Sequence, residues 1–213
     1  SIAPAKEILL NGHQFRIPDG FSIELAAPPT LADRPVNACL APDGRLFVTV
    51  SAGSTVRPVE DQNQDPKNRV VCLQDTTGSG VYDKATVFAE QVPFPEGILW
   101  FENAVYIAAP PAIWKFTDTN GDNVSDHQEK WYDGKTITGC ANDLHGPYAG
   151  PDGFLYWTKG AFAEQEIPHF RSKTVRKDRA AHILRARPDG SQREAVMSGG
   201  MDNPVGLTFC STG

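Results

Sequence analysis

One histidine in this chain lies among side chains that suit proton transfer. His145 follows Asn142 and Asp143 in the segment NDLHGP. A neutral imidazole has a pKa near physiological pH, so it can accept the proton of a substrate hydroxyl. We therefore predict that His145 is a general base and that Asp143 is a second catalytic residue. The remaining histidines have no convergent partners in the sequence and are expected on the surface or in packing roles: His13, His127, His169 and His182.

Further polar residues are expected to join His145. Glu96, Asn142 and Asn203 each precede a short apolar strand, in segments that are far apart along the chain. If those strands converge on one axis, their entry ends form a ring of carboxylate, amide and imidazole groups around one cavity. Glu96, Asn142 and Asn203 are the predicted cofactor-binding residues. The alternative is that such Asp and Asn side chains only cap turns.

A second candidate site lies in the acidic segment DTNGDNVSDHQE, residues 118–129. Its oxygen donors follow the spacing of a calcium-binding loop, with one position supplied by a backbone carbonyl. These donors are Asp118, Asn120, Asp122, Val124, Asp126 and Glu129. Asn123 and Ser125 stand where an EF-hand has glycine and an apolar residue, so the segment departs from that motif. We expect a structural calcium ion here; the alternative is a plain acidic turn.

The elements that must position these residues are β-hairpins. Residues 34–50, 94–109 and 144–160 each contain an apolar strand, a short polar turn and a second apolar strand, and 203–209 begins the pattern again. The turns of these hairpins lie at Asp43, Asn103 and Asp152, and those of a second set begin at Asp75, Asp118 and Asp189. Two hairpins make one four-stranded blade, so the recurrence predicts a β-propeller.

The predicted fold class is therefore all-β, a β-propeller with about three and a half blades in this chain. Residues 1–20 are expected to be an N-terminal extension, with a hint of a helical turn in 1–12, and residues 21–213 a partial propeller domain. The blades are expected at about 21–92, 93–140 and 141–200, with the start of the next at 201–213. Because closed propellers usually have four to eight blades, we expect the chain to be a fragment; the alternative is that an assembly partner supplies the remaining blades. Residues 161–181 lack clean periodicity and are expected to form a long functional loop.

The charge balance argues against a nucleic-acid partner. The chain has 20 basic and 26 acidic residues, a formal net charge of −6. Residues 171–187 nevertheless carry seven basic residues against the single acid Asp178. The basic residues are Arg171, Lys173, Arg176, Lys177, Arg179, Arg185 and Arg187. This segment is either a solvated surface loop or a rim that attracts an anionic ligand.

Other features concern location and redox state. No apolar run approaches the roughly 18 to 20 residues that a transmembrane helix needs, so we expect no transmembrane segment. The chain begins at Ser1 rather than Met, and we expect a processed protein in the periplasm or secreted. Its four cysteines lie too far apart for a zinc or haem-attachment motif, and either buried thiols or one or two disulfides fit them.

Several segments resemble a known family. LHGPYAGPDGFLYW, MDNPVGLTF, FSIELAAPP and PDGRLFV are similar to segments of the glucose/sorbosone dehydrogenase-like β-propellers. The greatest similarity is to the exported bacterial group labelled membrane-bound dehydrogenases, often fused to cytochrome c. The resemblance spans roughly residues 15–213 and implies a six-bladed propeller, of which about half is present. It also implies oxidation of a sugar or alcohol hydroxyl by hydride transfer to pyrroloquinoline quinone (PQQ), with a cytochrome c as electron acceptor.

The same resemblance implies roles for two residues. His145 matches the base that precedes the GPDG turn in these relatives, although the spacing to the turn is shorter here. Asn203 matches the Asn of an Asn-Pro pair that contacts the quinone. A basic residue precedes that pair in the relatives, whereas Asp202 stands here. Cations of residues 171–187 are expected to bind the carboxylates of the quinone instead.

Two other functions compete with the dehydrogenase. Glu96, Asn142 and Asn203 also resemble the channel ligands of gluconolactonase-like propellers, which hold one divalent cation and hydrolyse sugar lactones. Amide and carboxylate oxygens suit a hard cation such as Ca²⁺. The third hypothesis is a propeller without catalytic activity that binds carbohydrate or docks a cytochrome.

Overall fold

The segments with hairpin patterns form antiparallel sheets in the computed structural model, which describes residues 4–53, 66–135, 138 and 143–210. Sheet 1 has the strand order β3-β4-β5-β6. Its strands are β3 (Pro35–Leu40), β4 (Leu46–Val50), β5 (Asn68–Gln74) and β6 (Lys84–Val92). Sheet 2 has the order β10-β9-β8-β7. Its strands are β7 (Gly97–Phe101), β8 (Ala104–Ala109), β9 (Ala112–Thr117) and β10 (His127–Asp133).

Sheet 3 is larger and follows the order β11-β12-β15-β16-β13-β14. Its strands are β11 (His145–Ala149), β12 (Leu155–Lys159), β13 (Gln165–His169), β14 (Thr174–Asp178), β15 (His182–Ala186) and β16 (Glu194–Ser198). The chain is therefore all-β, as predicted, and the described residues contain no helix long and apolar enough to cross a membrane.

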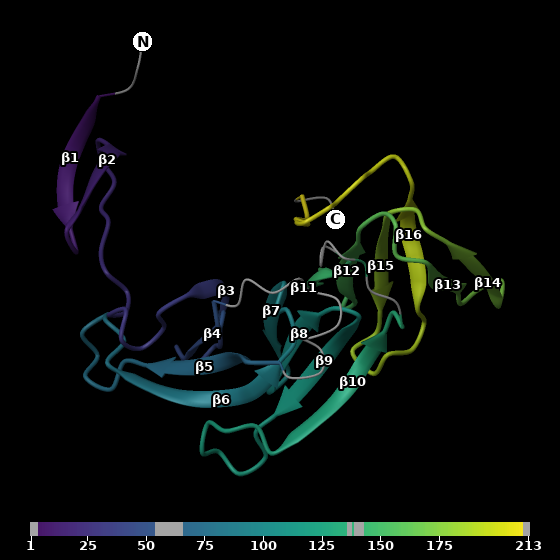
Figure 1. Cartoon of the computed structure of the whole chain (residues 1–213), viewed down its shortest axis with the longest axis horizontal. Helices are drawn as coiled ribbons and strands as arrows, with labels where there is room; N and C mark the ends of the chain where they lie inside the picture. The colour runs from purple at the N-terminus through teal and green to yellow at the C-terminus, as the bar shows by residue number, and fades with distance from the viewer. Residues whose placement is uncertain (1–3, 54–65, 136–137, 139–142, 211–213) are drawn as a thin grey trace.

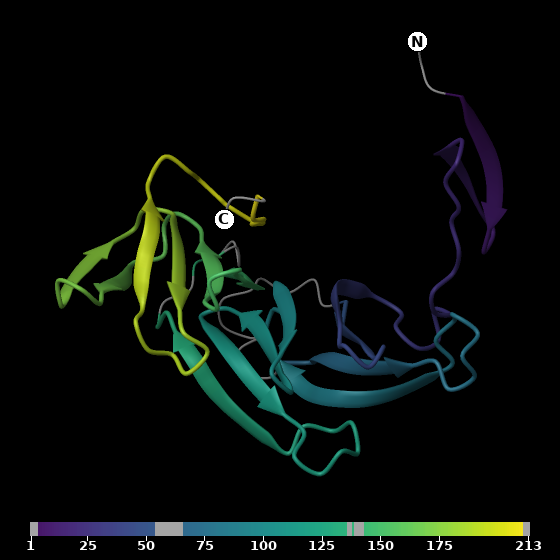
Figure 2. The same cartoon turned by 180° about the vertical axis from the view of Figure 1, so that it is seen from behind.

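The three sheets lie side by side as a fan (Figures 1 and 2). The first strand of sheet 2, β7, contacts the first strands of both neighbouring sheets, β3 and β11. Each following strand lies farther from this line of contact, because consecutive strands pair with one another in sequence order within sheets 1 and 2. The ends of β3, β7 and β11 are thus brought together although they are distant along the chain.

The predicted hairpin turns are confirmed. Each lies between two paired antiparallel strands, for example Asn103 between β7 and β8. Glu102 and Asn103 both have positive φ, at 47° and 62°, the backbone of a two-residue turn that matches the twist of the strands. Gly44, Gly153 and Gly190, which end the Pro-Asp-Gly turns of three of these hairpins, have φ of 87°, 76° and 79°. A left-handed backbone suits glycine, so these turns are encoded locally.

Two predictions about the remaining segments are wrong. Residues 5–18 contain no helical turn but the hairpin of β1 (Ala5–Leu10) and β2 (His13–Pro18), which stands away from the fan (Figure 1). The Asn11-Gly12 turn, with φ of 50° and 78°, favours this hairpin. Residues 161–181 do not form a long loop either, because β13 and β14 pair within them and join the edge of β16.

The core lies between the sheets. Sheets 1 and 2 pack across a cluster that includes Phe47, Phe88 and Ile107, and sheets 2 and 3 across a more aromatic one. At the centre of the second cluster, the Trp157 indole is 5.1 Å from the Trp131 ring, with the two planes near perpendicular. Edge-to-face packing of this kind adds to the free energy gained by burying the rings.

Strands β7 and β11 approach each other closely at Gly97 and Gly146. A Cβ atom on Gly97 would lie 2.2 Å from the carbonyl oxygen of Gly146, far inside van der Waals contact. Only a residue without a side chain allows β7 to approach β11 this closely. Since Glu96 precedes Gly97 and His145 precedes Gly146, this contact also sets the positions of two predicted site residues.

We predict that Gly97→Ala lowers the free energy of unfolding by roughly 1 to 3 kcal/mol, because the added methyl group must displace backbone. Urea denaturation followed by tryptophan fluorescence measures the change. Gly206→Ala is the matched control, since a Cβ there meets no atom within 4 Å. That variant should stay within about 0.5 kcal/mol of the parent. Equal stability of the two variants would contradict the close contact.

Candidate functional site

His145 and Glu96 meet where β7 and β11 begin. The His145 side chain is buried, with its residue only 6% exposed. Its Nδ1 lies 3.4 Å from the backbone oxygen of Glu96 and 3.8 Å from the Glu96 carboxylate. A carbonyl oxygen can only accept, so Nδ1 carries the proton of the neutral ring. The lone pair of the imidazole is then on Nε2, which is buried and has no hydrogen-bond partner among the described residues.

The segment after β16 brings Asn203 to the same place. The backbone oxygen of Asp202 accepts a hydrogen bond from the Ala161 N–H at 2.8 Å, and the oxygen of Pro204 accepts one from the Thr158 hydroxyl. Thr158 is the register partner of His145 across β11 and β12. The Asn203 amide consequently lies close enough to His145 to favour the protonated ring, although it makes no hydrogen bond of good geometry to Nε2.

The surroundings of His145 keep its ring neutral near pH 7. Burial lowers the pKa of His145 below its ordinary value of 6.5, and it outweighs the opposing effects of Glu96, Asn203 and Asp143. Burial also raises the pKa of the Glu96 carboxyl. An unprotonated imidazole with an unpartnered nitrogen is the form that a general base requires.

Asp143 is close to His145 but does not bond to it. Its buried carboxylate accepts hydrogen bonds from the Thr138 N–H at 2.6 Å and from the Thr138 hydroxyl at 3.0 Å. Asp143 therefore acts on His145 through its charge alone. Lys159, which is fully buried, also interacts electrostatically with Asp143. The fourth predicted member of the site, Asn142, lies outside the described residues.

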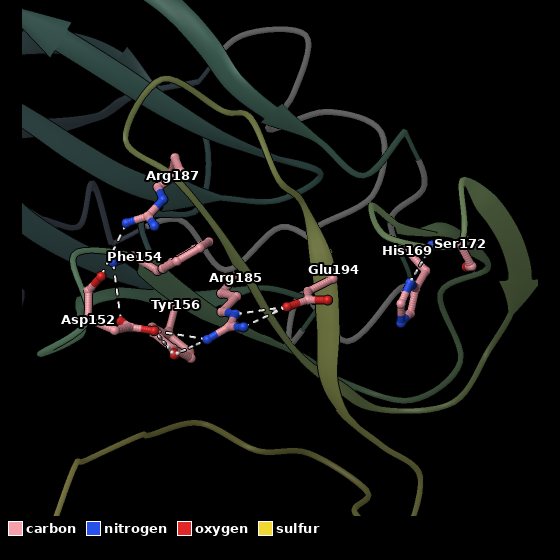
Figure 3. A network of polar contacts seen from close by, with 8 residues as sticks. All are labelled: Asp152, Phe154, Tyr156, His169, Ser172, Arg185, Arg187 and Glu194. Atoms are coloured by element: carbon pink, nitrogen blue, oxygen red, sulfur yellow. Dashed lines mark hydrogen bonds and ion pairs between the residues drawn. The ribbon is translucent and has the colours of Figure 1, made fainter.

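The basic segment 171–187 is largely neutralised. Arg185 is the most constrained of its cations (Figure 3). Its guanidinium donates to Glu194 at 2.6 Å and to Asp152 at 2.9 Å, and lies over the Phe154 ring at 4.4 Å. The Tyr156 hydroxyl bonds to both Arg185 and Asp152. Such an interlocked set fixes the end of sheet 3 and uses the donors that an anionic ligand needs.

Three other cations of the segment also have acidic partners. Lys177 and Arg179 both pair with Glu164, and Arg176 pairs with Asp178. These pairs are mostly solvent-exposed, so each contributes little to stability. They nevertheless weaken the attraction that seven basic residues would otherwise exert on an anion. The structure thus favours the solvated-surface hypothesis for this segment.

The predicted calcium loop is a hairpin tip at which carboxylates bind the loop's own amides. Asp118 accepts hydrogen bonds from the N–H groups of Gly121 and Asn123, at 2.7 and 2.8 Å. Asp126 accepts from the Thr119 N–H and hydroxyl. Asn120 and Asp122 form Asx turns in the same way. The Asn120 Oδ1 accepts a hydrogen bond from the Asp122 N–H at 2.9 Å, and the Asp122 Oδ1 accepts one from the Val124 N–H at 2.8 Å.

Glu129 lies apart from this tip. It belongs to β10, faces Lys115 of β9 in the strand register and forms an ion pair with that residue at 3.2 Å. Among the described residues, no three His, Cys, Asp or Glu side chains converge as a metal site. Without Glu129, the tip has fewer oxygen donors than the sequence spacing predicts for a calcium-binding loop.

The equivalent loop of sheet 1 explains why the Asp residues recur. Asp75 accepts hydrogen bonds from the N–H groups of Ser79 and Gly80, and Asp83 accepts from the N–H and hydroxyl of Thr76. Asp118, Thr119 and Asp126 use the same arrangement in sheet 2. An Asp-Thr pair with a second Asp eight residues after the first is thus a backbone-capping device that needs no metal.

The cysteines of sheet 1 are thiols rather than a disulfide. Cys39 and Cys72 lie on β3 and β5 with the Phe47 strand between them, and both are free. Burial raises the pKa of Cys39 to about 12 and that of Cys72 to about 11. Thiols with such pKa values stay protonated and unreactive, which fits a packing role.

The chain was compared with known proteins. A family described as "Domain of unknown function (DUF7133)" matches residues 10–213. The chain belongs to this family. The DUF7133 match includes all three sheets of the fan, together with Glu96, His145 and Asn203. No curated protein matches the chain.

The sequence predictions missed one polar cluster of this DUF7133 chain. His182 is fully buried and bonds to Asp178 and Ser198. The strand pattern HILRA contains a usable signal, because strict alternation places His182 on the same buried face as Leu184 and Ala186. A histidine on a buried strand face needs hydrogen-bonding partners, and their identity depends on contacts that the sequence does not reveal.

We predict that the His145 imidazole titrates below pH 6.5, because burial disfavours the charged ring. The unfolded chain then binds more protons than the folded one as the pH falls through 6.5, so His145 lowers stability on the acid side. Two-dimensional NMR of the ring protons over pH 4 to 8 measures the midpoint, and His145→Gln identifies the resonance. A midpoint at or above 6.5 would show that the ring is not desolvated.

Proposed function

We propose that this chain is an enzyme that oxidises a sugar or alcohol hydroxyl, with His145 as the general base. The observation that carries the proposal is the buried, unpartnered Nε2 of His145, whose ring is held by Glu96 through Nδ1. A buried polar atom without a partner is costly, and a substrate hydroxyl that donates to Nε2 removes that cost.

The roles of the surrounding residues follow from their charges. A substrate O–H donates to Nε2, and this nitrogen accepts its proton. Oxidation of the carbon also needs a separately bound two-electron acceptor, which would take the hydride. The Glu96 carboxylate, 3.8 Å from Nδ1, and the nearby Asp143 charge stabilise the imidazolium that forms. The Asn203 amide can hydrogen-bond a neighbouring hydroxyl and so orient the substrate.

The resemblance to quinoprotein propellers implies that PQQ accepts the hydride. PQQ carries carboxylates, whereas the groups near His145 include Glu96 and Asp143, and Asp202 stands where the relatives have a base. The expected cations of residues 171–187 are largely paired with acids. The described residues thus fit a neutral polyol better than an anionic quinone, and we derive no step through PQQ.

We also propose that the three sheets are blades of a β-propeller, with the six-bladed arrangement that the resemblance implies. Successive antiparallel sheets with adjacent first strands support this proposal, because the blades of a propeller meet at their innermost strands. An exported location and a cytochrome c as electron acceptor belong to the same proposal.

The alternative is a metal-dependent sugar lactonase that uses Glu96, Asn142 and Asn203. The observation that favours it is the approach of the Glu96 carboxylate and the Asn203 amide to one imidazole, which gathers oxygen donors of the type that Ca²⁺ prefers. In that mechanism the cation would polarise the lactone carbonyl. A carbohydrate-binding or cytochrome-binding protein without catalysis is the third candidate.

We predict that His145→Gln lowers kcat/KM for aldose or alcohol oxidation by roughly 10²- to 10⁴-fold, the usual contribution of a general base. The assay follows dye reduction across a panel of sugars and alcohols, both with and without added PQQ and calcium. His127→Gln is the matched control, because His127 is exposed on β10 in another sheet. Activity that survives His145→Gln unchanged would exclude this base.

The competing functions give different results in parallel assays. Calcium-dependent lactone hydrolysis that is lost in Glu96→Gln would favour the lactonase. Sugar binding by calorimetry that is equal in the parent and in His145→Gln, without turnover in either assay, would favour the binding protein.

We further propose that the tip of residues 118–129 binds calcium in a structural role. The side chains of Asp118, Asn120 and Asp122 support it, because their hydrogen bonds to the loop amides pre-orient oxygens that retain a second lone pair. The calcium ion would replace solvent at the tip of the β9–β10 hairpin, remote from His145.

We predict that calcium at 100 times its dissociation constant raises the free energy of unfolding by about 2.7 kcal/mol. Thermal unfolding with calcium and with EGTA measures the effect. Asp122→Asn should abolish the increase, whereas Asp189→Asn in the corresponding turn of sheet 3 should keep it. An identical unfolding curve with calcium and with EGTA would contradict the calcium site and favour a plain acidic turn.

A further inference from the structure

Sheet 3 contains a linear arrangement of Ser198, His182 and Asp178. The hydroxyl oxygen of Ser198 lies 2.9 Å from His182 Nδ1, and the Asp178 Oδ1 lies 2.7 Å from His182 Nε2. The imidazole is thus between a hydroxyl and a carboxylate, with both distances in the range of good hydrogen bonds. No part of the proposed mechanism at His145 uses these residues.

The carboxylate determines which nitrogen of His182 is basic. An ionised Asp178 can only accept, so Nε2 carries the proton of the neutral ring. Nδ1 is then an acceptor, and the Ser198 hydroxyl donates to it. This is the tautomer in which a histidine can remove the proton of a serine hydroxyl, with the two ring nitrogens exchanged relative to the serine proteases.

Neighbouring groups hold Asp178 and His182 in place. Although burial raises the pKa of Asp178, hydrogen bonds from His182 and the Ala180 N–H hold it below its ordinary value. The Nζ of Lys159 donates to the Ala180 carbonyl at 2.8 Å and fixes the turn between Asp178 and His182. Arg176 Nε lies 2.5 Å from the other oxygen of Asp178. The carboxylate is therefore ionised and is held by His182 and the Ala180 N–H.

The serine is accessible whereas its partners are not. His182 is fully buried, and Ser198 is exposed at the end of β16. His182 and Ser198 are register partners in β15 and β16, so the sheet itself sets their distance. After Ser198, a Cβ built on Gly199 or on Gly200 would meet no atom within 4 Å. The open space at these two glycines leaves room for a bulky acyl group next to the exposed Ser198.

We propose that Ser198, His182 and Asp178 form a nucleophilic site that cleaves carboxylic esters. The Ser198 oxygen bonds to the ester carbonyl carbon, and its proton moves to His182 Nδ1. The ester C–O bond breaks, and the leaving alcohol takes that proton. Water then gives a proton to Nδ1 and its oxygen to the acyl carbon, and the proton returns to Ser198 as the acid leaves. Because the serine lies on an exposed strand end, the substrate class is an ester presented on a large molecule.

The test uses a fluorophosphonate probe, which reacts covalently with activated serine hydroxyls. We expect the intact chain to be labelled at Ser198, located by peptide mass spectrometry, and Ser198→Ala to lose the label. His182→Gln and Asp178→Asn should each slow labelling at least about 100-fold, since the base or its orienting group is removed. Melting temperatures confirm that each variant is folded.

Ser172 is an internal control. It is an exposed serine in the β13–β14 turn whose hydroxyl pairs with Thr174 at 2.7 Å rather than with a histidine. Within the parent protein, labelling at Ser198 should exceed labelling at Ser172 by at least about 100-fold, a comparison that needs no variant to fold. Equal labelling of the two serines, or labelling of Ser198 that is independent of His182, would overturn the proposal. His145→Gln should label as the parent does, which separates this site from the proposed oxidation.

Discussion

The contact between Gly97 and Gly146 is the constraint on which the site depends. Each glycine follows directly after a residue of the site, Glu96 or His145, so the distance between two backbones sets the distance between two functional groups. A side chain at Gly97 would separate β7 from β11. The absence of a Cβ atom at residue 97 therefore determines both how closely these two sheets pack and where Glu96 and His145 lie.

Sheet 3 and the residues just before it bury more polar side chains than the other two sheets do. Seven of the nine buried polar residues among the described ranges lie between residues 143 and 194, and the other two belong to sheet 1. Buried polar groups cost free energy unless they are paired, so a sheet that gathers them must provide partners. Sheet 3 does so for Lys159, His182 and Glu194. Among the described residues, the Nε2 atoms of His145 and Gln165 have no such partner, and the histidine nitrogen is the basis of the proposed function.

The sequence predicted the elements better than their contacts. Hairpin turns such as Pro-Asp-Gly at residues 42–44 are local and depend on backbone preferences of a few residues, so all of the proposed turns were found. The Asn11-Gly12 turn carries the same kind of signal, but the apolar run before it was interpreted as a helical turn. The pairing of β13 with β16 was missed because it rests on a single register pair, His169 with Glu194.

The sequence predicts which residues form the candidate site but not the hydrogen bonds that their side chains make. The convergence of Glu96, His145 and Asn203 follows from the topology, whereas the bonding of Asp143 to Thr138 depends on side-chain distances within a turn. Counting charges within residues 171–187 cannot predict that several of its cations are paired, because partners such as Glu164 and Glu194 lie outside that segment.

The position of β14 at the edge of sheet 3 gives the basic residues on this strand a role in preventing intermolecular strand pairing. β14 is the outermost strand of sheet 3, and its residues Thr174–Asp178 include Arg176 and Lys177, whose side chains are mostly solvent-exposed. An outer strand offers unpaired amide and carbonyl groups to any other polypeptide, and charged side chains on it discourage intermolecular strand addition. The charged edge strand β14 thus disfavours aggregation by strand addition to the broadest sheet of the molecule.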